Sequence, residues 1–445
     1  MTRRKRYVSG LLRGSVFALG FAACGGEGTD ETIGSWDEYA KGCGNGVCSG
    51  KEDCSSCPSD CGVCAPPPGT GGGSTGTAIP SSSFGMHVMN QSNSPTVSFG
   101  SLGKAASVGW CYVERTKGVF SWSHLDSWAD YAAAHGQPIF YSHYCVPKWA
   151  AKDPSSCVCL SSACTVYNCP STVANLNDWT QWVTALVTRY RNRASGSIRI
   201  WELWNEPYLG TPGFQMTPPE FVAMANATHD IIRALDPGAT IVGPSGHASD
   251  YDAFWAAGMT HDLDIISTHG YPSLGNPTAE SLVPARMDAI KAVMADYNVS
   301  KPIWDTEGSW GIASLTSDQQ VAFVARFHLL HWANGVSRAY WYAWDNGSWG
   351  LLQGTAAATA YQMIHDWMVG ATMPNGCSIS GSVYACALTR PNGYQGLVVW
   401  NTSGSSSYTP SNAYVKYRDL SGNTVALAQG APITIGIKPI LLENQ

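Results

Sequence analysis

Residues 197–207 read Ser-Ile-Arg-Ile-Trp-Glu-Leu-Trp-Asn-Glu-Pro, and the rest of the chain is organised around this stretch. Its first half is an apolar run bounded by turn residues, which predicts a buried strand. The stretch ends in Asn-Glu-Pro, so the ionisable Glu206 stands where the strand gives way to a loop starting at Pro207. Strand ends of this kind hold the catalytic residues of strand-helix barrels. We therefore predict that Glu206 is a proton donor at the mouth of a pocket.

A second glutamate stands in a similar place farther along the chain. Residues 301–308 read Lys-Pro-Ile-Trp-Asp-Thr-Glu-Gly, in which a short apolar strand ends at Glu307 before a glycine-rich loop. Hydrolysis of a glycosidic bond needs one carboxyl group that is protonated near neutral pH and another that stays ionised. The two strand-end glutamates therefore indicate a glycosidase in which Glu206 and Glu307 are the catalytic pair.

Short apolar strands alternate with amphipathic helical stretches from Phe84 onward, which indicates βαβ units. Residues 217–220 (Thr-Pro-Pro-Glu) and 317–320 (Ser-Asp-Gln-Gln) read as capping boxes that start two of the helices. The predicted fold class is α/β, with a (β/α)8 TIM barrel over residues 83–370. The eight predicted strand cores are Phe84–Val88, Ala106–Trp110, Pro138–Ser142, Ile198–Trp204, Thr240–Pro244, Ile265–His269, Pro302–Thr306 and Arg338–Trp344.

The pattern changes after the last predicted helix, and residues 371–445 read as a small antiparallel β side domain. Short alternating strands are separated there by Asn-Gly and Ser-Gly turns, with no helical period. A disulfide between Cys377 and Cys386 would close a hairpin within it. The domain could bind carbohydrate, but we favour a packing role over the barrel helices. The predicted strands are Val383–Leu388, Gly396–Asn401, Tyr414–Arg418, Thr424–Ala428, Ile433–Ile437 and Pro439–Leu442.

The N-terminal part of the chain predicts export. Four basic residues at 3–6 precede an apolar stretch too short to span a membrane, so residues 1–23 read as a signal peptide. The sequence Phe-Ala-Ala-Cys ending at Cys24 resembles a bacterial lipobox, which predicts lipidation of Cys24; simple cleavage and secretion is the alternative. A tether (24–42), a cysteine-rich disulfide module (43–64) and a Pro/Gly/Ser linker (65–82) follow.

The chain has 15 cysteines, which indicates an oxidising compartment. Apart from Cys24 they fall into three even groups, so we predict disulfides within each group. Zinc bound by the loop cysteines, or calcium bound by acidic residues of the module, is less favoured. We predict no metal ion and no cofactor. The groups are Cys43, Cys48, Cys54, Cys57, Cys61 and Cys64 in the module, Cys111, Cys145, Cys157, Cys159, Cys164 and Cys169 around the loop after the third strand, and Cys377 with Cys386.

Composition narrows the class of ligand. Charged residues make up 13% of the chain, well below the roughly 25% of an average soluble protein. The 18 tryptophans and polar uncharged loops suit neutral sugars, and the formal net charge of −6 argues against a nucleic-acid partner.

Together these motifs resemble the clan A glycoside hydrolases over residues 83–445. The Asn-Glu-Pro strand end, the strand ending at Glu307, residues 268–271 (Thr-His-Gly-Tyr) and residues 340–344 (Tyr-Trp-Tyr-Ala-Trp) carry the resemblance. Residues 110–122 are similar to a motif of family 39, although Arg115 and Phe120 replace a proline and a tyrosine of that motif. The resemblance implies that Glu206 is the acid/base, that Glu307 is the nucleophile, and that the anomeric configuration is retained.

The same resemblance implies several substrate-binding residues. Asn205 matches the asparagine that bonds the sugar 2-hydroxyl. His269 and Tyr271 end the sixth strand, from which the hydroxyl of Tyr271 would keep the nucleophile ionised and aim it. Trp344 would form the floor of the sugar site. Trp110 and His143 are weaker candidates for its walls, and we favour a structural role for each. Glu202 would lie on the same face of the predicted strand as Glu206, but we expect it to be a buried, paired carboxylate.

These observations predict a retaining glycoside hydrolase that acts on a neutral or hemicellulose-like polysaccharide or oligosaccharide outside the cell. We expect a monomer, in contact with a membrane only through the lipid on Cys24. The alternative is a non-catalytic, carbohydrate-binding surface lipoprotein built on a barrel scaffold.

Overall fold

The computed structural model describes residues 76–103 and 107–445. The predicted signal peptide, tether and cysteine-rich module, and with them Cys24, lie outside the described residues. Within the described part of the chain, no helix combines the length and apolar character needed to cross a membrane.

Eight parallel strands form a closed ring. The strands lie in two runs, β2-β1-β10-β9-β8 and β3-β6-β7. Parallel bridges join these runs at both ends, from Leu102 to Ile139 and from Val242 to Ile265. The predicted (β/α)8 barrel is therefore confirmed. Its strands are β1 (Phe84–Met86), β2 (Ser101–Leu102), β3 (Phe140–Ser142), β6 (Ile200–Glu202), β7 (Thr240–Val242), β8 (Ile266–Gly270), β9 (Ile303–Gly308) and β10 (Val336–Trp341).

The prediction of the second strand at Ala106–Trp110 is wrong. The second strand of the ring is the two-residue β2, and Trp110 instead begins the short helix α2 (Trp110–Val113). Val108 and Trp110 are buried, which is why this segment resembles a strand in sequence. Burial alone does not distinguish a strand from a buried helical turn, and a strand of two residues has no measurable periodicity.

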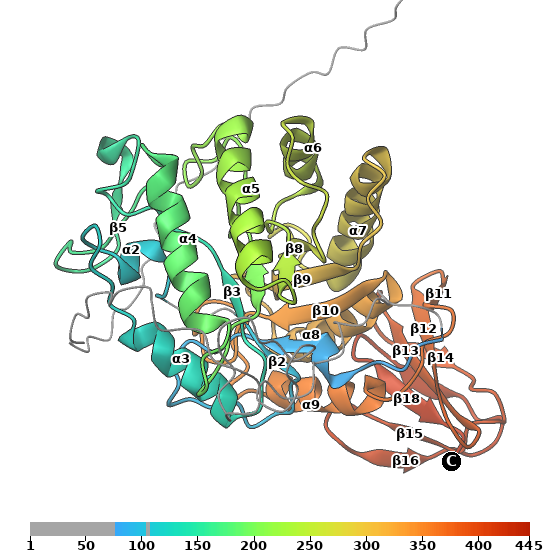
Figure 1. Ribbon diagram of the computed structural model, residues 1–445. Coiled ribbons are helices and arrows are strands. Elements are labelled where there is room, and N and C mark those ends of the chain that lie inside the picture. Colours follow the sequence, from blue (N-terminus) through green and yellow to red (C-terminus); the bar gives the residue numbers. More distant parts are fainter. Residues whose placement is uncertain (1–75, 104–106) are drawn as a thin grey trace, which may run out of the picture.

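The helices surround the strands, and Figure 1 shows α4 to α7 standing in a row beside them. Both predicted helix starts carry a capping box. Thr217 and Glu220 cap α5 as predicted, whereas α8 is capped one residue earlier than predicted, by Thr316 with Gln319. The helices are α3 (Ser123–Ala134), α4 (Leu176–Tyr190), α5 (Pro218–Leu235), α6 (Ala248–Ala256), α7 (Ala279–Asp296), α8 (Ser317–Ala333) and α9 (Ala356–Met368), with 3-10 turns η1 (Ser81–Ser83) and η2 (Pro154–Ser156).

The chain after α9 forms the expected antiparallel β structure, which lies beside α8 and α9 in Figure 1. Its main sheet has the order β11-β12-β13-β18-β15-β16, and β14 pairs with β17 separately. Two short strands, β11 and β14, were not predicted. The strands are β11 (Cys377–Ser380), β12 (Val383–Arg390), β13 (Tyr394–Asn401), β14 (Ser406–Tyr408), β15 (Lys416–Arg418), β16 (Thr424–Ala426), β17 (Ile433–Ile435) and β18 (Ile440–Glu443).

Polar side chains fasten this sheet to the barrel. Trp400 on β13 donates from Nε1 to Oε1 of Glu280 on α7 at 2.8 Å. Arg326 on α8 lies 3.4 Å from the same carboxylate and also donates to the carbonyl of Ile437. Glu280 and Arg326 are both largely buried. Such contacts fit the packing role that we favour for the β domain.

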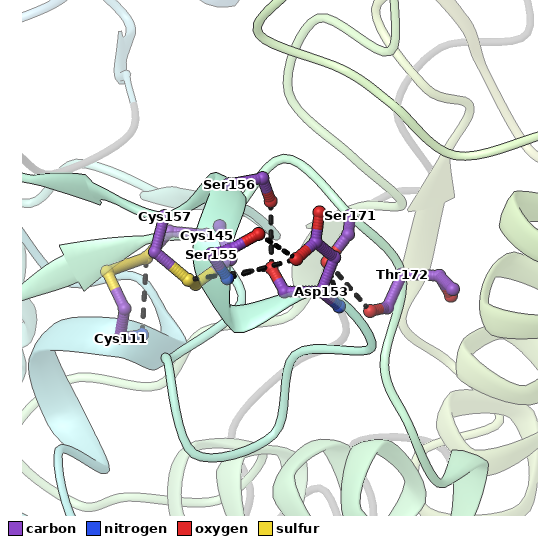
Figure 2. Close-up of a disulfide and its surroundings, with 9 residues drawn as sticks. Cys111, Cys145, Asp153, Ser155, Ser156, Cys157, Ser171 and Thr172 are labelled. Carbon is purple, nitrogen blue, oxygen red and sulfur yellow. Dashed lines mark hydrogen bonds between the residues drawn. A yellow bond between two sulfur atoms is a disulfide. The ribbon is translucent and has the colours of Figure 1, made fainter.

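The loop after β3 is stapled by disulfides, as predicted from the even cysteine groups. The bridges are Cys111–Cys145, Cys157–Cys169 and Cys159–Cys164, and Cys377–Cys386 joins β11 to β12. Figure 2 shows the Cys111–Cys145 bridge and, close by, Asp153, whose carboxylate accepts hydrogen bonds from the backbone and side chain of Ser155. The loop also contains the two-stranded ladder of β4 (Val158–Cys159) and β5 (Tyr167–Asn168).

Candidate active site

Glu206 lies just beyond the end of β6, at the mouth of the barrel. Its backbone has a φ of 53°, in the left-handed region that few residues other than glycine adopt. The backbone N–H of Glu206 donates to Oγ of Ser245 at 3.0 Å, which helps to hold this conformation. The Glu206 side chain is 35% exposed, so its carboxyl group can meet a ligand. Strained backbone of this kind is concentrated at functional sites.

Glu307 is part of β9, and its side chain is 10% exposed. The hydroxyl of Tyr271, just after β8, donates to Glu307 Oε1 at 2.8 Å. Burial, reinforced by the charge of Glu307, holds the pKa of Tyr271 well above its usual value. The phenol therefore stays protonated and remains a hydrogen-bond donor to the carboxylate.

His269, on β8, lies between the two glutamates. Its Nδ1 is 2.9 Å from Oε1 of Glu206 and 4.0 Å from Oε1 of Glu307. Ligand atoms of these three residues all lie within 4.8 Å of one another. Segments at the ends of β6, β8 and β9 therefore bring two carboxyl groups and an imidazole together.

The same cluster has a donor set that could hold a divalent cation, because carboxylate oxygens and imidazole nitrogens are common metal ligands. Hydrogen bonding already accounts for the arrangement. His269 and Tyr271 each place a polar atom within 2.9 Å of a carboxylate oxygen. The geometry is that of two carboxyl groups oriented by their neighbours.

A buried pair behind the site, missed from sequence, supports β8 and β9. Asp305 accepts hydrogen bonds from the backbone of Gly270 at 3.0 Å and of Glu307 at 3.3 Å. Nε2 of His331, on α8, lies 2.7 Å from Oδ2 of Asp305. The pair thereby fixes the backbone that carries Glu307. Two features of the sequence could have indicated this pair. Asp305 is a charged residue within an apolar strand, and His331 is a histidine within an apolar helix.

Glu202 lies inside the barrel and is buried, as predicted. Its carboxylate accepts hydrogen bonds from the hydroxyls of Ser142 at 2.6 Å, Ser267 at 3.0 Å and Thr306 at 2.6 Å. These donors come from β3, β8 and β9. Burying a carboxylate is costly unless it is well hydrogen-bonded, and three hydroxyl donors meet that need. Glu202 ties strands together beneath the site.

Trp344, predicted to form the floor of the sugar site, is buried with 2% of its surface exposed. The neighbouring partly exposed aromatic is Tyr342, which directly follows β10. Its ring lies 5.2 Å from that of His87, and its hydroxyl is one of the groups that raise the pKa of Tyr271. The strand ends at Trp341, so the alternation along β10 does not decide which way the side chains beyond it point.

Trp110 and His143 are also buried, at 0% and 1% exposure, which fits the structural role that we favour for each. Trp110 donates to Glu114 at 2.6 Å within the packed aromatic core. His143 is held by the carbonyl of Glu202 at 2.8 Å, and burial lowers its pKa to about 4. Asn205 is partly exposed beside Glu206, and its backbone N–H donates to the His143 carbonyl.

Tyr208 is a further residue at the site that sequence reasoning missed. Its hydroxyl lies 3.4 Å from Oε1 of Glu206, and its ring stacks on His247 at 4.2 Å. Asp250 holds His247 at 3.1 Å. Burial, together with the charge of Glu206, keeps the pKa of Tyr208 well above its usual value. Tyr208 thus offers a second protonated donor beside Glu206.

Comparison with known proteins agrees with the barrel fold. A model of glycosyl hydrolase family 10 matches residues 70–222. A family 39 glycoside hydrolase from the gut symbiont Bacteroides cellulosilyticus WH2 is 15% identical, with a TM-score of 0.65, over 82% of this chain and 81% of that chain. The fold is that of glycoside hydrolase barrels.

Two further solved structures share this fold. A glucosidase from Croceicoccus marinus is 13% identical over 84% of this chain and 97% of that chain, with a TM-score of 0.56. A bifunctional glucanase-xylanase from a metagenome library is 14% identical over 82% of this chain and 96% of that chain, also with a TM-score of 0.56. No curated protein matches the sequence significantly.

Proposed function

We propose that the chain is a retaining glycoside hydrolase that cleaves O-glycosidic bonds of a neutral or hemicellulose-like polysaccharide or oligosaccharide. One observation carries the proposal: carboxylate oxygens of Glu206 and Glu307 lie within 4.8 Å of each other across the barrel mouth. Retaining enzymes hold their two carboxyl groups ~5–5.5 Å apart, whereas inverting enzymes leave ~6.5–9.5 Å for a water molecule. The close pair favours double displacement.

In the first step, Glu206 donates its proton to the glycosidic oxygen while a carboxylate oxygen of Glu307 attacks the anomeric carbon. The bond between that carbon and the glycosidic oxygen breaks, and the leaving sugar departs with the proton. The product is a glycosyl ester on Glu307. The greater exposure of the Glu206 side chain suits its contact with the departing sugar.

In the second step, Glu206 takes a proton from water, and the resulting nucleophile attacks the anomeric carbon. The ester bond breaks, and Glu307 is released as a carboxylate. Two inversions give net retention of configuration. Glu206 regains its proton from the same water, so both groups return to their starting states.

Two neighbours support these roles. The protonated hydroxyl of Tyr271 donates to Glu307, which stabilises the ionised form needed for attack and aims one oxygen. His269 lies 2.9 Å from Glu206 and can donate to its carboxylate or accept from its acid form as the proton moves. Asn205, beside Glu206, would bond the 2-hydroxyl of the sugar whose anomeric carbon reacts.

A neutral, hemicellulose-like substrate is supported by composition and by the relatives. Charged residues are few in this chain, and aromatic side chains such as Tyr342 lie near the catalytic pair. One structural relative is named as a glucanase-xylanase, and another as a glucosidase. Neutral β-linked glucans and xylans are therefore the first substrates to test.

The test is sugar release from a polysaccharide panel by the wild type, Glu206→Gln and Glu307→Gln. We expect both variants to lose ~10³-fold or more in kcat, as when one member of a catalytic unit is removed. Asp288→Asn, which changes an exposed carboxylate on α7, is the matched control and should keep full activity. Proton NMR of the first-formed product should show the anomer of the substrate; the opposite anomer would contradict double displacement.

The alternative function, a non-catalytic carbohydrate-binding lipoprotein, makes a different prediction. A polysaccharide would then be bound equally by wild type, Glu206→Gln and Glu307→Gln, and none of the three would release sugar. The presence of both carboxyl groups, each with an oriented hydrogen-bond partner, favours catalysis.

We also propose that the protein is exported and held at the outer surface of the cell by a lipid on Cys24. Four disulfides among the described cysteines support an oxidising compartment. The test is fractionation of cells that express the wild type or Cys24→Ser. Activity that moves from the membrane fraction to the medium in the variant supports the anchor, and an unchanged distribution contradicts it.

A further inference from the structure

A cleft lies between the loop that follows β9 and the loop that follows β10. Its volume is about 260 Å³. One wall comes from the segment that includes Trp310 and Ile312, and the opposite wall from the segment that includes Trp349, with Gln320 and Thr355 at its edge. Both loops leave the carboxyl ends of barrel strands, the face on which barrel enzymes bind substrate.

The cleft adjoins the Glu307 side of the catalytic pair. The ring of Trp349 meets the ring of Tyr271 edge-on, with centroids 5.0 Å apart. The hydroxyl of Tyr271 in turn bonds Glu307 at 2.8 Å. Gly311, with a φ of +63°, passes so close that an added Cβ would lie 3.3 Å from Tyr271 and 3.4 Å from Trp349. The walls of the cleft and of the catalytic site are thus continuous.

The chemistry of the lining selects a class of ligand. The walls combine aromatic and aliphatic side chains, among them Trp349 and Ile312, with uncharged polar groups such as Gln320 and Thr355. No acidic or basic residue is among the residues that line it. Aromatic faces pack against the C–H faces of sugars, while amide and hydroxyl groups bond sugar hydroxyls. A volume slightly below the ~300–1,000 Å³ of drug-sized sites leaves room for about one sugar unit.

We propose that this cleft is a glycan subsite that binds a neutral sugar unit on the Glu307 side of the scissile bond. The inference rests on the proposed hydrolase function and adds the extent of the substrate to it. The enzyme then holds at least two sugar units on the side that becomes esterified to Glu307. The products released from that side are disaccharides or longer, and single sugars are not removed stepwise from chain ends.

The test compares substrates of increasing length. Probes are neutral β-1,4-linked xylo- and gluco-oligosaccharides of one to five units that carry a chromogenic leaving group. In Gln320→Ala and Ile312→Ala we expect kcat/KM to fall on the order of tenfold for donors of two or more units, and to be unchanged for the single-unit donor. Leu274→Ala, an exposed change on the loop after β8, is the matched control and should resemble the wild type at every length.

Equal losses at all lengths, or no loss at any length, would overturn the subsite. Thermal unfolding of each variant checks that it is folded. Failure of the hydrolase proposal is recognised separately, because the wild type would then release no chromophore. In that case calorimetric binding of the unmodified oligosaccharides decides: binding that is weakened by Gln320→Ala supports the subsite, and binding that is absent or unaffected contradicts it.

Discussion

Individual side chains at the barrel mouth give the two carboxyl groups different surroundings. Glu206 is the more exposed and lies beside His269 and Tyr208, whereas Glu307 is more deeply placed and accepts a hydrogen bond from Tyr271. One environment suits a group that exchanges protons with substrate and water, and the other suits a group that stays ionised. Because both residues are glutamates, the difference between their environments comes from the side chains around them.

Replacement of Tyr271 by Phe tests this division. The change removes the hydroxyl that donates to Glu307 at 2.8 Å and leaves the ring that packs on Trp349. A hydrogen bond to a charged group contributes roughly 1.5–3 kcal/mol, so kcat should fall roughly 10- to 100-fold. Tyr297→Phe removes a hydroxyl bonded to Asp252 away from the site, and its kcat should equal that of the wild type. Equal kinetics in the two variants would refute the role of Tyr271.

His143 should make stability depend on pH. Burial lowers its pKa to about 4, whereas an unfolded histidine titrates near its ordinary 6.5. Between these values the unfolded state binds more protons, so the free energy of unfolding falls as pH drops from 6.5 to 4, by about 3 kcal/mol in total. His143→Gln should therefore show a shallower decline in urea unfolding over this window.

Another buried histidine contributes to the same decline. His328 is buried and its pKa is also lowered by burial, so some decline with falling pH should persist in His143→Gln. A His143→Gln slope identical to that of the wild type would contradict the assignment.

At the scale of elements, β8 and β9 form the platform on which the site is built. Asp305 on β9 accepts a hydrogen bond from the backbone N–H of Gly270 on β8. His331 on α8 bonds the other oxygen of the same carboxylate. The two strands come so close that a side chain at position 270 has no space, because a Cβ there would lie 1.9 Å from Asp305 Oδ2.

Gly270→Ala should therefore be destabilising. Overpacking of a buried position typically costs about 1–3 kcal/mol, and displacement of Asp305 should also lower activity. Gly275→Ala, in the loop after β8, is the matched change, because nothing lies within 4 Å of the Cβ that it adds. Thermal unfolding and kcat of both variants provide the measurement. Similar values for the two would show that the strands can move apart freely.

The success of sequence reasoning varied with the element. The apolar runs that lead to Glu206 and Glu307 could be recognised, because a strand followed by Gly or Pro has a clear boundary. The two-residue β2 could not, since so short a strand has no period. Trp344 was proposed from the resemblance alone, and only the fold shows that this side chain is buried whereas Tyr342 is partly exposed. The Asp305–His331 pair joins distant segments, and only the fold brings them together.

For the whole molecule, the β domain and the barrel share a buried polar contact. Glu280 on the barrel accepts from Trp400 on the β domain and also lies beside Arg326. A buried carboxylate and guanidinium are costly to separate from their partners. Detaching the domain would expose these groups and the apolar surface around them. The barrel and the β domain are therefore expected to unfold in one cooperative transition.

Trp400→Phe tests that coupling. The replacement keeps an aromatic ring beside Tyr384, with which Trp400 stacks at 5.0 Å, but removes the donor to Glu280. Leaving a buried acceptor without this partner should lower the free energy of unfolding by about 1–3 kcal/mol. Tyr384→Phe keeps the stacked pair and should be nearly neutral. Calorimetry should show a single transition that shifts as a whole; a separate low-temperature transition would contradict the coupling.

The closure of the ring has a kinetic consequence. Phe84 of β1 pairs with Ala339 of β10, so β1 cannot form this pairing until the far later β10 has been synthesised. Contacts between segments so distant in sequence form slowly, and large chains of this kind pass through partly folded intermediates. Until β10 arrives, one edge of β1 presents unpaired backbone groups that can join another chain. The interval before closure is thus the stage at which this protein is most prone to aggregate.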